Sequence, residues 1–194
     1  MEILLTAHNP DWKIQFQQEK LSLLDALKNL SPEIEHVGST SVENLAAKPI
    51  IDIMIGVHTE HELESVVELL KPQPYVYKEI YNEELPFRRF FVGLKEEYIH
   101  QFPKEMTKLN NVEIPHEYRT SHLHVVPIQS QWWEDHLLFR DHLRENPEDR
   151  LEYEKVKKQL STETWENGNE YAEAKTGCIQ TILKKAKENK RTHT

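Results

Sequence analysis

The most constraining feature of this sequence is the run from Ile50 to Ile55, in which every residue but one is aliphatic or methionine. Isoleucine-rich runs without polar alternation are typical of a strand that is covered on both faces. The exception is Asp52, inside the run. Burying a carboxylate costs free energy, so we expect a cation, a metal ion or a hydrogen-bond donor beside it.

Apolar periodicity predicts the elements around this strand. Helices are expected over residues 12–29 and 60–70, further strands over 34–37, 75–81, 87–92 and 121–126, and C-terminal helices over 133–144, 148–160 and 169–187. Gly56 is expected to close the strand that contains Asp52, residues 95–118 read as a loop, and the charged faces around residues 145–158 as solvated surface. This order predicts an α+β fold, with a core of residues 1–128 and helices of residues 129–194 packed on it as one compact unit.

The charge balance excludes some classes of function. The chain has 24 Lys and Arg against 33 Asp and Glu, a net charge of −9, which opposes broad nucleic-acid binding. No apolar run approaches the roughly 18 residues of a membrane span, and no signal-peptide pattern opens the chain. The single cysteine, Cys178, cannot form an internal disulfide. We therefore expect a cytoplasmic protein without membrane partners, and the oligomeric state stays open.

A glycine-serine turn precedes the strand of Asp52. The chain has only 5 glycines, and Gly38 opens the segment Gly38-Ser39-Thr40-Ser41 directly after a predicted strand. Bare backbone, three hydroxyls and free N–H groups form a natural cradle for phosphate. The same composition is also common in ordinary turns and helix caps, and a single aspartate near a strand end often caps a loop.

These motifs resemble a known family. The spacing from Gly38-Ser39 to Asp52 is similar to the signature of the nucleotidyltransferase superfamily. More closely, the chain resembles the GrpB-like family of bacterial proteins within it, through Glu35-His36-Val37-Gly38-Ser39-Thr40-Ser41, Ala46-Ala47-Lys48-Pro49-Ile50-Ile51-Asp52, His122-Leu123-His124-Val125, Phe139-Arg140-Asp141 and Tyr171-Ala172-Glu173-Ala174-Lys175-Thr176. The resemblance runs from Asn9 to about Ala186 and implies a nucleotidyltransferase-like mixed β-sheet flanked by helices.

The resemblance also implies a site. Gly38 and Ser39 would hold a triphosphate, paired carboxylates on the next strand would bind two divalent ions, and a third acid on a later strand would activate the attacking hydroxyl. The sequence departs from this pattern because Met54 stands where the second acid belongs, and the later strand carries His122 and His124.

The two histidines suggest a different metal site. Residues two apart in a strand share a face, so His122 and His124 could converge with Asp52 on one ion, with His36 as a further participant. Magnesium or manganese would suit the superfamily, whereas a His-His-Asp set also suits zinc, nickel or iron. Strand histidines that bond only to backbone are the alternative.

Basic residues suggest anion binding. Lys48, Arg88, Arg89 and Arg119 lie near the candidate motifs, and Arg140 and Lys175 come from the helical part. Arginine forks bind phosphate in bidentate fashion, and together with Gly38, Ser39, Thr40 and Ser41 these side chains could bind a nucleotide or another phosphate-containing small molecule. Scattered surface cations are the alternative.

The hypotheses for function follow from these sites. The first is divalent-metal-dependent nucleotidyl transfer to a small acceptor, with Asp52 and Ser39 as catalytic residues and Asp52, His122 and His124 as metal ligands. The second is a catalytically reduced module that binds a nucleotide or small anion. The third is a mononuclear metal hydrolase.

Overall fold

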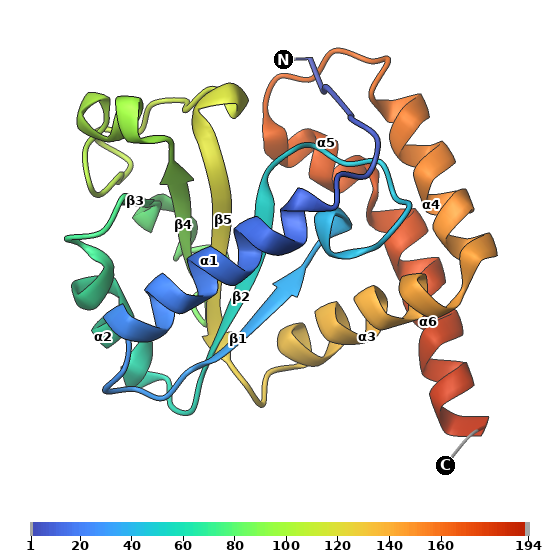
Figure 1. Ribbon diagram of the computed structural model, residues 1–194, viewed down its shortest axis with the longest axis horizontal. Helices are drawn as coiled ribbons and strands as arrows, with labels where there is room; N and C mark the ends of the chain where they lie inside the picture. Colours follow the sequence, from blue (N-terminus) through green and yellow to red (C-terminus); the bar gives the residue numbers. More distant parts are fainter. Residues whose placement is uncertain (1, 193–194) are drawn as a thin grey trace.

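The computed structural model describes residues 2–192 and contains a five-stranded mixed sheet with helices on both sides (Figure 1). The strand order is β1-β2-β5-β4-β3. β2 and β5 are parallel, and every other neighbouring pair is antiparallel. The strands are β1 (Glu33–Val37), β2 (Ile51–Val57), β3 (Tyr75–Tyr77), β4 (Arg89–Leu94) and β5 (Arg119–Pro127). The predicted α+β class is confirmed.

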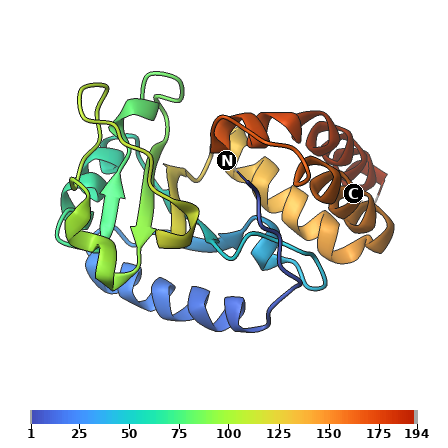
Figure 2. The ribbon, with the colours of Figure 1, turned by 90° about the horizontal axis from the view of Figure 1, so that it is seen from above.

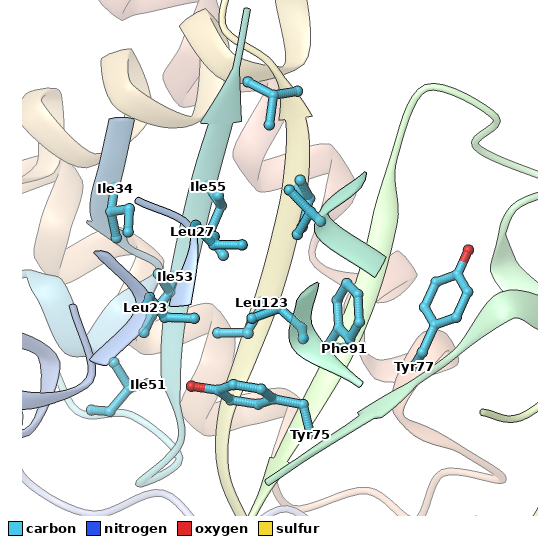
Figure 3. Packing of buried hydrophobic residues seen from close by; sticks show 14 of the residues in the cluster. Leu23, Leu27, Ile34, Ile51, Ile53, Ile55, Tyr75, Tyr77, Phe91 and Leu123 are labelled. Atoms are coloured by element: carbon cyan, nitrogen blue, oxygen red, sulfur yellow. The ribbon is translucent and has the colours of Figure 1, made fainter. Parts of the chain in front are cut away.

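One face of the sheet is covered by α1 (Asp11–Ala26) and α2 (His61–Leu70), and it holds the main apolar core. Alternate residues of β2 point to this face and meet the apolar stripe of α1, as Figure 3 shows for Ile51, Ile53 and Ile55 beside Leu23 and Leu27. Helix α1 ends at Ala26, three residues before the predicted end.

The other face is covered only in part. Helix α3 (Gln131–Glu145) packs through Trp133 on Val37 of β1, Met54 of β2 and Val126 of β5. Helices α4 (Pro147–Leu160), α5 (Gly168–Ala174) and α6 (Thr176–Thr192) lie beyond it, beside the sheet, as seen from above in Figure 2. A second apolar cluster joins these helices to the segment after the glycine-serine turn: Val42, Leu45, Leu143, Tyr153 and Ile182.

Three expected element boundaries are wrong. The strand predicted over 75–81 ends at Tyr77 and is followed by a 3₁₀ turn, Glu79–Tyr81, and the helix predicted over 169–187 is divided into α5 and α6 at Lys175. β2 continues through Gly56 to Val57, and a Cβ on Gly56 would lie 2.8 Å from the Trp133 ring. The glycine thus lets α3 approach the strand instead of ending it.

Two further observations concern the expected loop and the expected absence of membrane spans. Residues 95–118 include two 3₁₀ segments, Glu96–Gln101 and His116–Tyr118. Across residues 2–192, none of the helices combines the length and the apolar character needed to cross a membrane.

Candidate functional site

The half-covered face of the sheet borders a cleft of about 700 Å³. Its walls come from β2, β4 and β5, from the segments around residues 39–50, 78–88 and 111–116, and from α4 and α5. Four acidic side chains line it, namely Asp52, Glu84, Glu113 and Glu173, against six cationic ones, Lys48, Lys78, Arg88, Arg119, Lys157 and Lys175. The cleft is therefore a cationic region within a chain of net charge −9.

Gly38 and Asp52 face each other across the first two strands. The pairing of β1 with β2 sets Val37 opposite Asp52, and Gly38 follows with a φ of 67°, in the left-handed region. A Cβ on Gly38 would lie 2.2 Å from Asp52 Oδ2. Only glycine satisfies both the backbone conformation and the contact, and its missing side chain leaves the room that the carboxylate occupies.

Asp52 is held by a chain of polar contacts to His122 and Arg119. His122 Nδ1 lies 3.2 Å from Asp52 Oδ1, and Arg119 donates to His122 Nε2 at 3.3 Å. Since a guanidinium only donates, His122 must accept at Nε2 and carry its proton on Nδ1, which donates to Asp52. Burial acts to raise the pKa of Asp52, but this hydrogen bond and the attraction of His122, His124 and Lys48 outweigh it and lower the pKa to about 2. The carboxylate is ionised at neutral pH.

The expected metal site needs a free nitrogen lone pair on His122 and on His124. Arg88 donates to His124 Nδ1 at 3.3 Å, as Arg119 donates to His122 Nε2. In each histidine, the nitrogen that accepts this bond therefore directs its lone pair at a guanidinium group. A divalent ion on either nitrogen would have to displace an arginine. Met54, in place of the second acid, is fully buried.

Within residues 2–192, no group of three or more His, Cys, Asp or Glu side chains is arranged to hold a metal ion. His36 lies on the opposite face of the sheet, where it stacks on Phe16 with 4.6 Å between ring centroids. The residues as arranged therefore do not fit the expected metal, and the metal site stays a prediction.

Three lysines meet at the helical wall of the cleft. Lys48 and Lys175 lie over the ring of Tyr171, with Nζ 5.3 Å and 4.3 Å from its centroid. Lys157, 2% exposed, donates to Ser39 Oγ at 2.9 Å and to the carbonyl of Ala46. Burial is the main cause that lowers all three pKa values, to about 7 for Lys157 and about 8 for Lys175. Among the described residues, none of these three lysines forms an ion pair with a carboxylate.

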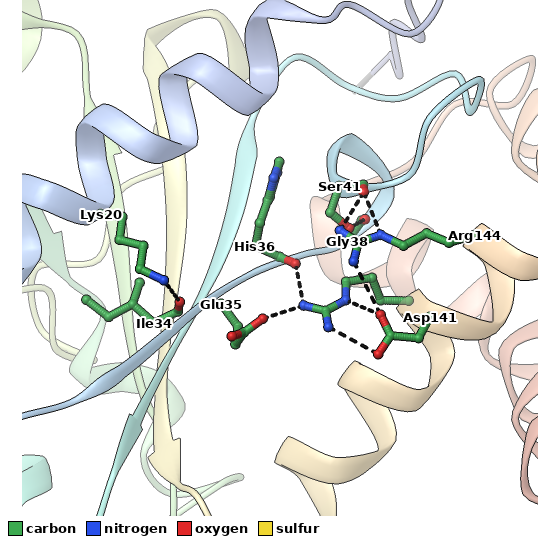
Figure 4. A network of polar contacts seen from close by, with 9 residues as sticks. Lys20, Ile34, Glu35, His36, Gly38, Ser41, Asp141 and Arg144 are labelled. Carbon is green, nitrogen blue, oxygen red and sulfur yellow. Dashed lines mark hydrogen bonds and ion pairs between the residues drawn. The ribbon is translucent and has the colours of Figure 1, made fainter. Parts of the chain in front are cut away.

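A second cationic cluster holds the glycine-serine turn from outside the cleft (Figure 4). Arg140 donates to Glu35 at 2.6 Å, to Asp141 at 2.7 Å and to the carbonyl of His36 at 3.1 Å. Arg144 donates twice to the carbonyl of Ser41, at 2.9 Å and 3.1 Å. These arginines are bound to carboxylates and carbonyls, so they fix the turn to α3.

The structure brings together most, but not all, of the residues that the sequence singled out. Cleft-lining positions are Ser39, Thr40, Lys48, Asp52, Arg88, Arg119, His122 and His124, with Gly38 against Asp52. Ser41 instead bonds to the carbonyl of Gly38 at 2.7 Å and faces the outer side. Arg89 pairs with Glu64 of α2 at 2.6 Å, on the α1 face.

Sequence reasoning missed Lys78, His116, Lys157 and Tyr171, which also line the cleft. The solvated face expected around residues 145–158 is wrong at Lys157, because this side chain turns inward to the glycine-serine turn. Its position four residues after Tyr153, on one helix face with a buried aromatic ring, was the available signal. The tyrosine hydroxyl of Tyr171 is buried and, within the described part of the chain, has no hydrogen-bond partner.

Comparisons with known proteins agree on one family. A family model described as GrpB protein matches residues 2–185. A "Glutamate-rich protein GrpB" of Alkalihalophilus pseudofirmus is 32% identical, with 94% of each chain covered, and a UPF0157 protein of Streptomyces coelicolor is 32% identical, covering 96% of this chain and 85% of its own. The crystal structure of the conserved protein GrpB from Enterococcus faecalis matches with a TM-score of 0.74 and 30% identity, over 96% of this chain and 98% of that one.

Proposed function

The chain belongs to the GrpB family, and from that premise we propose that its cleft binds a small phosphate-containing molecule. Lys48 and Lys175 bind the phosphate, Lys157 lies behind Ser39 at the same wall, and Arg88 and Arg119 add positive charge at the sheet wall. This is the hypothesis of an anion-binding module, now with lysines at the helical wall of the cleft as its main contacts.

The observation that carries the proposal is the set of three lysines without a carboxylate partner. Buried or half-buried cations destabilise a fold unless an opposite charge offsets their desolvation. Among residues 2–192, Asp52 is the one carboxylate whose charge acts on all three lysines, and Asp52 already accepts from His122. A phosphate supplies several acceptor oxygens and two negative charges, which is the complement that these lysines lack.

Metal-dependent nucleotidyl transfer remains the second candidate, and the contact between Gly38 and Asp52 favours it, since this pairing is the part of the superfamily pattern that the chain keeps. Nucleotidyl transfer predicts that the protein releases pyrophosphate from a nucleoside triphosphate, and that it does so only when a divalent ion is added. The buried Met54 and the arginine-bound histidines count against it, and against a mononuclear hydrolase.

The test is titration calorimetry with inorganic phosphate, pyrophosphate and nucleoside mono-, di- and triphosphates, each with a metal chelator and again with magnesium. We expect saturable binding without metal, and binding weakened roughly tenfold by Lys175→Met, the loss of one charge-assisted contact. The matched control is Lys155→Met, which removes an exposed lysine of α4. Equal affinity in both variants, or no binding of any phosphate compound, would refute the proposal.

A further inference from the structure

We propose that Ser39 is a nucleophile of this cleft and that Lys157 is its general base, so that the protein accepts a phosphoryl group on Ser39. The proposal rests on the proposed function, because a phosphate-containing molecule must first be bound beside the lysines.

The geometry places a hydroxyl between the cleft and a buried amine. Ser39 lines the cleft and is partly exposed, whereas Lys157 is 2% exposed and approaches Ser39 Oγ to 2.9 Å from behind. A serine paired with a buried lysine is a known alternative to the serine–histidine pair in nucleophilic catalysis. A hydrogen bond that only held the fold together would not need Ser39 to lie at the wall of the cleft.

The hydrogen bonds around Ser39 are complete when Lys157 is neutral. The charged amine donates both to Ser39 Oγ and to the carbonyl of Ala46. Once neutral, it can keep its N–H bond to Ala46 and accept the hydroxyl proton of Ser39 on its lone pair across the same 2.9 Å. Tyr153, buried beside Lys157, contacts Ser39 through its hydroxyl. Burial and the nearby charge of Lys175 lower the pKa of Lys157 to about 7, so the neutral amine is present at physiological pH.

The transfer step balances with an aryl phosphate monoester as donor. Ser39 Oγ attacks phosphorus and forms an O–P bond, while the bond from phosphorus to the aryl oxygen breaks and the phenolate leaves with the electron pair. The hydroxyl proton passes to Lys157 Nζ, which becomes charged. Lys48 and Lys175 lie on the same side of the cleft, where they neutralise the phosphoryl oxygens.

The experiment uses the full chain with p-nitrophenyl phosphate at pH 8. Binding is measured by calorimetry, phenolate release by absorbance, and the modified residue by peptide mass spectrometry. We expect one phosphate on Ser39, no such modification in Ser39→Ala, and phosphorylation slowed roughly 100-fold in Lys157→Arg, which keeps the charge but cannot act as a base. Matched controls are Ser22→Ala on the exposed side of α1 and Lys158→Arg, the exposed neighbour of Lys157.

A pH profile separates a base from an anchor. The rate in the unmodified chain is expected to rise as Lys157 loses its proton around pH 7; the charged groups that influence this lysine are Lys175, Glu154, Asp52 and Lys158. Binding without modification of Ser39, a phosphate on a histidine instead, or an unchanged rate in folded Lys157→Arg would overturn the inference and leave the proposed function standing. Absence of binding of p-nitrophenyl phosphate would overturn the inference, and the proposed function falls as well only if inorganic phosphate, pyrophosphate and the nucleotides also fail to bind.

Discussion

The two cationic clusters on either side of the glycine-serine turn differ in what neutralises them. On the outer side, Arg140 and Arg144 are bound to carboxylates and backbone carbonyls. On the cleft side, Lys48, Lys157 and Lys175 have no carboxylate partner within the part of the chain that the structure describes. The paired cluster stabilises the fold, whereas the unpaired cluster stores a desolvation cost that a ligand can relieve.

The largest expected effect is on the paired side. Arg140→Met should lower the free energy of unfolding by about 3 kcal/mol, because Glu35, Asp141 and the carbonyl of His36 lose a half-buried donor. Urea denaturation measures the change, with Arg191→Met on the exposed end of α6 as the control. A loss no greater than that of the control would show that the outer cluster is not structural.

The pH dependence of stability tests the same side of the turn. Burial lowers the pKa of His36 from 6.5 to about 4, so the stability from this group is present above pH 6.5 and is lost as the pH falls towards 4. At pH 5 the penalty is about 2 kcal/mol. His36→Gln should therefore lose about 2 kcal/mol less than the unmodified chain between pH 7 and pH 5. Equal losses in both proteins would contradict the assignment; His116, whose pKa is lowered to about 3, adds a loss of the same sign to both.

On the cleft side, removing a cation should stabilise the protein. Lys175 has a pKa lowered to about 8, so between pH 8 and 10.5 the unfolded chain binds more protons and stability rises with pH. For this half-buried group we expect Lys175→Met to gain about 1 kcal/mol at pH 7.5 and to show a flatter rise towards pH 9.5. Thermal denaturation in both buffers checks this, and a loss of stability would mean that Lys175 is already neutralised.

The smallest effect separates two adjacent arginines. Arg88→Met should weaken phosphate binding about threefold through loss of one cleft charge, while Arg89→Met should leave the affinity unchanged, since Arg89 pairs with Glu64 on the other face. Calorimetry on both variants decides the matter. Equal weakening would mean that charge, and not position, governs binding.

Much of the fold followed from local patterns. The apolar run around Asp52 predicted a strand covered on both faces, and helix periodicity located the helices α2, α3 and α4 to within a few residues. Two of the boundaries that failed involve distant partners: β2 continues through Gly56, on which Trp133 packs, and β3 ends at Tyr77, whose backbone also bonds to residues 104 and 106. Local sequence does not encode those contacts.

The candidate site was predictable only in its sheet half. Gly38 and Asp52 were found from the glycine-serine turn and the apolar run that follows it, and His122 and His124 because residues two apart in a strand share a face. Arg88 and Arg89 were predicted to bind together, and only the structure places them on opposite faces. The hydrogen bonds from Arg88 and Arg119 to the histidines were not predicted: Arg119 lies three residues before His122 in β5, whereas Arg88 is 36 residues from His124 along the chain. They decide which nitrogen carries the proton.

By itself, the sequence determined the strand that carries Asp52, the glycine-serine turn before it and the family to which the chain belongs; the structure added that Gly38 leaves room for the Asp52 carboxylate. Only the tertiary structure decided which cations matter. Lys157 of α4 and Lys175, between α5 and α6, lie more than one hundred residues beyond the glycine-serine turn. Lys157 reaches Ser39 because an apolar cluster of Val42, Leu45, Tyr153 and Ile182 packs α4 and α6 against the segment after the turn. The charge of a residue does not show whether its side chain is buried or paired, because desolvation and ion pairing depend on what surrounds that side chain in space.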